Sequence, residues 1–253
     1  MPKNVKLGDY NSLAKSYRQS RPNYSTEINS ILKLIIRKGS KISTLDLGSG
    51  TGIFSKLMSQ ISQEVVGVEL SKEMIKNAYK LKKIKYINSS VEKLKLKKKF
   101  DIITSASSFH WFNNAKVKKI IEKNLKQNGF FFITYNSRVI HKNPFLFKVE
   151  KKIYSLNKSF KKRVSSGSSK FVETKIINFS KISNLKGPIY LEFFHYEKFS
   201  LKRYLTVWDS SNEFRNKLGE KNYELFKTWI KKNFPKKGII AIYKNKSWLL
   251  QKK

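Results

Sequence analysis

The sequence predicts an α/β fold with a doubly wound, mostly parallel sheet, and three observations predict it. Short apolar runs alternate with segments whose apolar residues recur at helical spacing, which is typical of strands and helices that follow one another along the chain. The first strand-like run leads into a G-x-G-x-G turn at residues 48–52. The next run ends in an acid, Glu69. A glycine turn and an acid at the tips of successive strands indicate a nucleotide or nucleoside site in an open sheet.

The elements of the first half are expected in a regular order. Residues 25–38 form the first helix, because five apolar residues lie on one helical face: Ile28, Ile31, Leu32, Ile35 and Ile36. Gly39 ends this helix. Strands are expected at 42–47, 64–70, 83–88, 100–105 and 130–135. The segments between them carry helical spacing, as in Val117, Ile120, Ile121 and Leu125.

Beyond residue 136 the alternation of strands and helices stops. The elements expected there are a helix at 143–157, a flexible loop at 165–169, a strand at 189–196, a mostly helical and aromatic segment at 200–234, and a closing hairpin at 238–250 with its turn at 244–246. We therefore predict one domain, residues 1–253. Its parts are an N-terminal helical lid at 1–24, a cofactor-binding core at 25–137, and a helical and aromatic cap with closing strands at 138–253.

The glycine turn and the acid together indicate the kind of ligand. Glycines at alternate positions leave no Cβ to hold a ligand away from the backbone. A dinucleotide fingerprint needs its third glycine where Ile53 stands, so the spacing disfavours a pyrophosphate cofactor. Glu69 suits two vicinal ribose hydroxyls, because hydrogen bonds to a charged acceptor are worth roughly 1.5–3 kcal/mol each. The alternative, for the glycine turn taken alone, is an ordinary tight loop.

Two later strand ends extend this site. The strand at 83–88 is followed by the polar turn 89–92, which can reach the edge of a base. The strand at 100–105 continues into residues 106–112, an aromatic cluster at a strand end, which is where ligands bind in such sheets.

Five segments in order, DLGSGTG, VVGVEL, SSVEKLKL, FDIITSASSFHWF and LKQNGFFFITYN, resemble the class I S-adenosylmethionine-dependent methyltransferases. Within that family they are similar to the group that includes trans-aconitate methyltransferase, in which the fourth strand's segment ends in His-Trp-Phe. The resemblance covers residues 10–136 well and the rest loosely. It implies a Rossmann-like, seven-stranded sheet, a methyltransferase activity and S-adenosylmethionine as the cofactor.

The resemblance also implies which residues bind this cofactor. Gly48, Gly50 and Gly52 would pass under its methionine part, with Glu69 on the ribose and Leu70 on the adenine. Ser90 and Val91 would contact the adenine edge. Family members often carry Asp at the position of Ser90, so the backbone contact from Val91 is the one we expect to be kept. The predicted set is completed by Asp46, Ser49, Ser105, Tyr17 and Arg21.

The lid and the cap contribute further candidates. Tyr17-Arg18-x-x-Arg21-Pro22-x-Tyr24 resembles the family's element before the core, in which an aromatic and an arginine close over the methionine end of the cofactor. Arg21 would pair with the carboxylate there, and the alternative is a solvated cation before a proline turn. Most aromatics of the cap are expected in its core. Tyr204 and Trp208, at helical spacing, are predicted to line the acceptor pocket together with Trp111.

His110 is the candidate catalytic residue, because it is the only histidine at a predicted site. A hydroxyl or amine acceptor would need a general base, whereas a carboxylate acceptor is already ionised at neutral pH. Contact with the acceptor and a purely structural role are the alternatives for His110.

Composition excludes several classes of site. The chain has no cysteine and three scattered histidines, so we expect no metal site. The N-terminus lacks the apolar run of a signal peptide, and no apolar stretch reaches the roughly 18 residues that a membrane span needs. We therefore expect a cytoplasmic protein without a membrane partner. The sequence does not determine its oligomeric state.

The net charge of +37 points first to a nucleic acid. However, 47 of the 54 basic residues are Lys and seven are Arg, while recognition of phosphates and bases favours the planar fork of Arg. The Lys pairs are spread along the whole chain, as a drift in composition would produce. A small-molecule acceptor is therefore the favoured partner, and an RNA methyltransferase is the alternative. A non-catalytic cofactor-binding protein is the third class.

Overall fold

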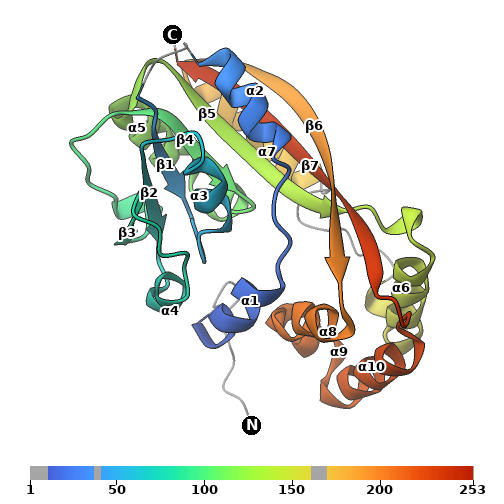
Figure 1. Ribbon diagram of the computed structural model, residues 1–253. Coiled ribbons are helices and arrows are strands. Elements are labelled where there is room, and N and C mark those ends of the chain that lie inside the picture. Colours follow the sequence, from blue (N-terminus) through green and yellow to red (C-terminus); the bar gives the residue numbers. More distant parts are fainter. Residues whose placement is uncertain (1–10, 37–40, 161–169, 253) are drawn as a thin grey trace.

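The computed structural model describes residues 11–36, 41–160 and 170–252, so the loop predicted at 165–169 lies outside it. A seven-stranded sheet forms the centre, in the order β3-β2-β1-β4-β5-β7-β6 (Figure 1). The strands are β1 Ser43–Leu47, β2 Glu64–Glu69, β3 Ile84–Asn88, β4 Phe100–Ala106, β5 Leu125–Arg138, β6 Leu185–Phe199 and β7 Ile239–Lys252. Strands β1 to β5 are parallel, and β7 runs antiparallel between β5 and β6. The predicted seven-stranded, mostly parallel sheet is confirmed.

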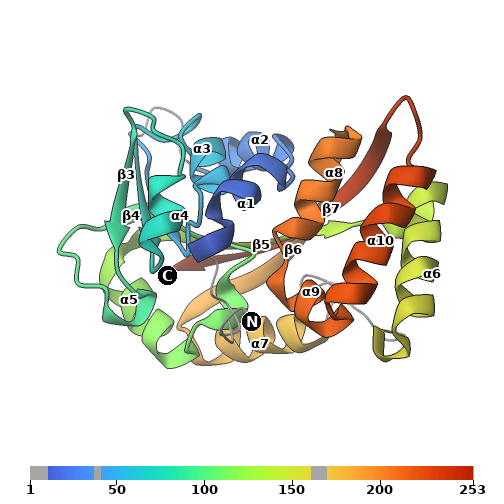
Figure 2. The ribbon, with the colours of Figure 1, turned by 90° about the horizontal axis from the view of Figure 1, so that it is seen from below.

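Helices cover both faces of the sheet, which confirms the doubly wound arrangement. The helices are α1 Ala14–Ser20, α2 Glu27–Ile35, α3 Ile53–Met58, α4 Lys72–Lys76, α5 Asn114–Asn124, α6 Pro144–Leu156, α7 Lys170–Ile182, α8 Leu201–Asp209, α9 Asn212–Leu218 and α10 Glu220–Asn233. Helices α2 and α3 pack on one face, and α5 and α7 pack on the other (Figure 2). Within the described residues, no helix has the length and apolar character that crossing a membrane requires.

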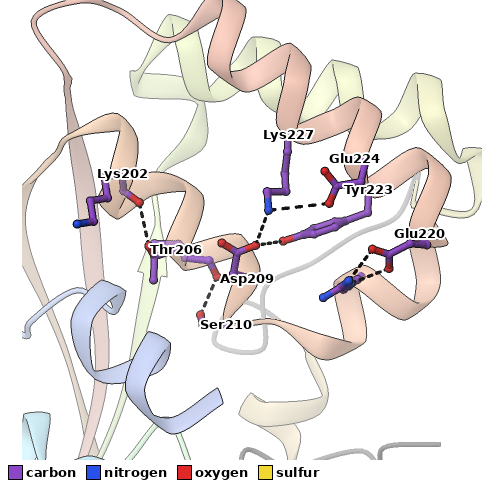
Figure 3. Close-up of polar contacts among 10 residues, drawn as sticks. Lys202, Thr206, Asp209, Ser210, Glu220, Tyr223, Glu224 and Lys227 are labelled. Atoms are coloured by element: carbon purple, nitrogen blue, oxygen red, sulfur yellow. Dashed lines mark hydrogen bonds and ion pairs between the residues drawn. The ribbon is translucent and has the colours of Figure 1, made fainter. Parts of the chain in front are cut away.

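The three strands β5, β7 and β6 extend beyond β1–β4 and carry a separate helical layer (Figure 1). This layer, which we call the cap, consists of α6, α8, α9 and α10 with the strand ends beneath them. Its core is aromatic, with Phe145, Tyr223 and Phe226 buried. A polar contact joins two of its helices: Asp209, at the end of α8, accepts hydrogen bonds from Tyr223 Oη (2.8 Å) and Lys227 Nζ (3.1 Å) of α10 (Figure 3).

The hairpin predicted at 238–250 is wrong, because these residues form the single strand β7. Asn245, placed in the predicted turn, is fully buried and pairs with Asn136 of β5 and Phe193 of β6. The Lys-Asn-Lys sequence alternates between the two faces of the strand: Asn245 is buried, while Lys244 and Lys246 form ion pairs with glutamates. A polar tripeptide in the middle of a strand therefore has the composition of a turn without its geometry.

The strand expected at 130–135 is also longer than predicted, since β5 runs from Leu125 to Arg138. Its register against β4 shifts between Phe100 and Ile102, near Asn128, which has a φ of +60°. The extension past residue 135 carries the chain out of the core and into the cap. Helix α1 lies between the two parts, where it packs against α4 on the core side and α8 on the cap side.

Candidate functional site

The glycine turn after β1 takes the conformation that its sequence predicts. Gly48, Gly50 and Gly52 have φ values of +71°, +55° and +74°, a region that favours glycine. A Cβ at Gly48 would lie 2.7 Å from that of Ser108, and a Cβ at Gly52 would overlap the Tyr86 hydroxyl. A Cβ at Gly50 would meet nothing within 4 Å. Packing therefore requires glycine at 48 and 52, while Gly50 faces open space at the carboxyl edge of the sheet.

Glu69 ends β2 directly beside this turn. Its Oε2 accepts a hydrogen bond from the Gly50 backbone N–H (2.9 Å), and its Oε1 accepts one from the Ser71 N–H (2.9 Å). A carboxylate has about four lone-pair positions, so two backbone bonds orient the group and leave room for two further donors. The following residue, Leu70, is 70% exposed, and Asn88 Nδ2 donates to its carbonyl oxygen (2.7 Å). The oriented carboxylate of Glu69 and the exposed apolar side chain of Leu70 therefore lie next to each other.

Three of the predicted cofactor residues have buried side chains, and two of them, Asp46 and Ser105, support the turn from behind. Asp46 is fully buried, and its carboxylate accepts from the hydroxyls of Ser55 (2.6 Å) and Thr104 (2.9 Å). Burial raises the pKa of Asp46 to about 6. Ser105 is fully buried and shares a hydrogen bond with the Ser108 hydroxyl (2.7 Å). The third, Val91, packs its side chain into the core, so only its backbone is available to a ligand.

Two buried hydroxyls of the turn, Ser49 Oγ and Thr51 Oγ1, have no hydrogen-bond partner among the described residues. Ser90 is half-buried at the end of the loop after β3. Unpartnered buried polar groups are uncommon in native proteins, and a polar ligand or water at the turn would satisfy them.

The end of β4 brings His110 to the same edge of the sheet. Residues Phe109–Trp111 form a 3-10 turn in which the His110 N–H donates to the Tyr135 hydroxyl (2.9 Å), and His110 Nδ1 lies 3.2 Å from it. The Trp111 ring lies 4.5 Å from the imidazole, between centroids, and is half-exposed. Burial and the Lys175 ammonium lower the pKa of His110 to about 4. The imidazole is therefore neutral at neutral pH.

Tyr24 and Ser107 join this site without having been predicted. Their hydroxyls lie 3.0 Å apart, and Ser107 has a φ of +54°, which is rare for a residue with a side chain. The Ser107 N–H donates to the Thr134 carbonyl oxygen (2.7 Å) and holds this conformation. Such positions cluster at functional sites. Tyr24 appears in the lid pattern of the sequence, but no local signal distinguishes Ser107 from the serines beside it.

The lid and cap candidates lie further out. The Arg21 guanidinium lies 4.6 Å from the centre of the Tyr17 ring, and its Nη2 donates to the Ser210 carbonyl oxygen (3.2 Å) after α8. Arg21 therefore joins α1 to the cap, and its pairing with a cofactor carboxylate stays a prediction. Tyr204 and Trp208 are 1% and 3% exposed. The structure places both in the aromatic core of the cap, because α8 turns its aromatic face inward, and their contact with the acceptor stays a prediction.

Comparison with known proteins gives a consistent assignment. A family model described as "Methyltransferase domain" matches residues 45–133. An uncharacterized methyltransferase of Alkaliphilus oremlandii is 31% identical over 157 residues, which are 59% of this chain and 72% of the relative. The chain belongs to the class I S-adenosylmethionine-dependent methyltransferases.

Two further matches describe the extent of the likeness. The ubiquinone biosynthesis O-methyltransferase of Pelagibacter ubique is 34% identical over 128 residues, 49% of this chain and 45% of that protein. A type II methyltransferase structure from Anaeromyxobacter dehalogenans has a TM-score of 0.66 at 15% identity and covers 90% of this chain and 97% of its own. The matched segment spans about half the length of the first curated relatives. The narrower likeness to the trans-aconitate methyltransferase group stays a prediction.

The residues at the edge of the sheet fit S-adenosylmethionine, the cofactor of this family. Open space at Gly50 admits a ligand against the backbone, and the two free lone-pair positions of Glu69 suit the ribose diol. The exposed side chain of Leu70 offers an apolar surface to a flat base. We therefore expect these three residues to make the principal contacts with the cofactor.

We predict that Glu69→Ala weakens S-adenosylmethionine binding about ten- to a hundredfold, because two hydrogen bonds to a charged acceptor are lost and water replaces them in part. Isothermal titration calorimetry measures this directly. Glu64→Ala is the matched control, since Glu64 lies at the other end of β2 and pairs with Lys98 and Lys85 on the surface. Equal affinities for the Glu69 variant and the wild type would rule out the ribose assignment.

A second prediction concerns the buried Asp46. Its pKa is about 6 in the fold, against an ordinary value of 3.8, so the folded state binds the proton more tightly than the unfolded state. The free energy of unfolding therefore falls as pH rises from about 4 to about 6, and Asp46 accounts for up to about 3 kcal/mol of this decrease. We expect no such decrease in Asp46→Asn. In urea unfolding from pH 4 to 7, the free energy of unfolding of the variant should therefore rise relative to that of the wild type.

Asp101 provides a control of opposite sign. Burial alone would raise the pKa of this carboxyl, but hydrogen bonds from Lys126 and Ser43 hold it below its ordinary value. The charged carboxylate stabilises the fold at a pH above that ordinary value, and this stabilisation is lost as pH falls. The free energy of unfolding of Asp101→Asn should therefore decrease relative to that of the wild type as pH rises. A constant difference between the wild type and Asp46→Asn across this range would contradict the buried charge at Asp46.

Proposed function

We propose that the protein transfers the methyl group of S-adenosylmethionine to a carboxylate or hydroxyl oxygen of a small molecule. The observation that carries this proposal is the placement of His110 and Trp111 at the carboxyl edge of the sheet that also carries Gly50 and Glu69. Helix α1, packed against both α4 and α8, borders this edge between core and cap. The O-methyltransferase relative from Pelagibacter ubique supports an oxygen acceptor.

The residues of the site have mainly to bind and align the reactants. S-adenosylmethionine, when bound, supplies a methyl group on an already activated leaving group. Glu69 and the glycine turn would fix the cofactor's position, and the turn that contains His110 would fix the acceptor's. Alignment of this kind is worth roughly 7–11 kcal/mol of the barrier. Exclusion of water by α1 and the cap would add to it.

RNA is the second candidate acceptor, because the net charge of +37 favours polyanions. The arginines of the described part, however, are engaged within the protein. Arg18 lies 3.3 Å from the Tyr79 ring centre, Arg138 lies 5.5 Å from that of Trp208, and Arg21 bonds to the Ser210 carbonyl oxygen. Arg203 and Arg215 form ion pairs with glutamates. Among the described residues this leaves Lys for phosphate contacts, which supports the small-molecule proposal.

A labelled-methyl assay tests the proposal with three sets of acceptors: small carboxylates, small alcohols and bulk tRNA. We expect transfer to a small carboxylate or alcohol, with a rate that changes little between low and physiological salt. Any binding to tRNA should fall steeply over the same range, because it depends on counterion release. Sequence-selective methylation of RNA at physiological salt would overturn the small-molecule acceptor.

A further inference from the structure

The hydroxyl of Tyr135 is the buried polar group closest to the proposed chemistry. Tyr135 lies on β5 and is fully buried, with its ring packed edge-on against Trp248. Its hydroxyl accepts the His110 backbone N–H (2.9 Å) and lies 3.2 Å from His110 Nδ1. Burial raises the pKa of this hydroxyl above its ordinary value, so it keeps its proton at neutral pH.

That proton determines the state of the imidazole. A buried hydroxyl proton without an acceptor costs about 1–3 kcal/mol, and within the described residues the acceptor within reach is His110 Nδ1. Nδ1 therefore accepts, and a neutral imidazole must then carry its own proton on Nε2. Nε2 has no partner in the described part of the chain and is not among its buried unpartnered atoms, so it is accessible.

Helix α7 holds the same turn from the other side. Lys175 Nζ donates to the carbonyl oxygens of His110 (3.0 Å) and Phe112 (2.5 Å), and the Lys175 carbonyl oxygen accepts from Asn114 Nδ2 (3.3 Å). The ammonium opposes a second proton on the ring, and Glu92, whose charge acts on Lys175, is the nearby carboxylate. The turn is thus held at its backbone by Lys175 and at its imidazole by Tyr135.

We propose that Tyr135 is a positioning residue that fixes His110 as the Nε2–H tautomer, so that His110 donates a hydrogen bond to the methyl acceptor and the acceptor is an ionised carboxylate. This inference rests on the proposed function and narrows it. A hydroxyl or amine acceptor would need to give up a proton, and neither nitrogen of His110 is free to take it. A carboxylate needs no base. One oxygen accepts from Nε2–H while the other forms the O–CH₃ bond with its own electron pair, as the C–S bond breaks toward sulfur and no proton is transferred.

The tautomer can be observed without any substrate. In protein labelled with ¹⁵N-histidine, two-bond couplings distinguish Nδ1 from Nε2 protonation, and the signals that disappear in His110→Gln assign this ring among the three histidines. We expect the wild type to show the neutral Nε2–H form from pH 6 to 8. An Nδ1–H form, or a charged ring in this range, would overturn the proposal.

Tyr135→Phe tests the positioning role, and Tyr223→Phe is the matched control because it deletes an equally buried hydroxyl in the cap. We expect Tyr135→Phe to mix the two tautomers and to raise the acceptor KM about three- to tenfold, the loss of one hydrogen bond, with unchanged S-adenosylmethionine affinity. The control should leave the tautomer and the KM unchanged. Unaltered tautomer signals in Tyr135→Phe would overturn the role of Tyr135.

The acceptor class is tested on the wild type, so it does not depend on a variant that folds. The probes are short di- and tricarboxylic acids and diols of the same chain length, and we expect transfer to carboxylates alone. Transfer to diols alone would overturn the carboxylate inference while leaving the methyltransferase proposal standing. Failure to bind S-adenosylmethionine would overturn the proposed function, and the acceptor inference with it, whatever the tautomer.

The donor role also separates two variants of His110. His110→Gln should keep part of the carboxylate activity, because its amide can still donate, whereas His110→Leu cannot. Equal losses of about 10²–10⁴-fold in both would indicate a general base and overturn the proposal.

Discussion

The hydrogen bond from the Gly50 N–H to the Glu69 carboxylate joins the two strand ends on which the site depends. It needs a backbone that turns through the left-handed conformation that glycine favours, and an acid that reaches back from β2. The parallel pairing of β1 with β2 brings these two ends to one edge of the sheet. The buried Asp46 then holds the turn from below, with α3 and β4 as its anchors.

The proposed acceptor side of the site depends on a second structural feature, the length of β5. By continuing to Arg138, this strand supports the core and the cap at once, and it places Tyr135 beneath the His110 turn. Helix α7, from the second half of the chain, also holds this site, which is made by the first half. Lys175 shows this coupling, since it contacts carbonyl groups more than 60 residues earlier in the sequence.

The features that the sequence predicted are local ones. The glycine turn, Glu69 at a strand end and the five parallel strands follow from composition and spacing within short segments, whereas Leu70 was implied by the family resemblance. The errors came where distant contacts decide the outcome. A polar tripeptide around Asn245 became a central strand because β5 and β6 pair with it on both sides, and β5 became longer than predicted because it pairs with β7 as far as Arg138. The contact between Tyr135 of β5 and His110 of the turn after β4 joins two segments 25 residues apart, so no local pattern in the sequence predicts it.

The most direct test of the cofactor site is a crystal structure of the protein with S-adenosylhomocysteine, the demethylated cofactor. We predict that both ribose hydroxyls lie within hydrogen-bond distance of the Glu69 carboxylate and that the ligand lies against the Gly50 backbone. A ligand whose ribose contacts other residues, while Glu69 keeps only its bonds to Gly50 and Ser71, would contradict it.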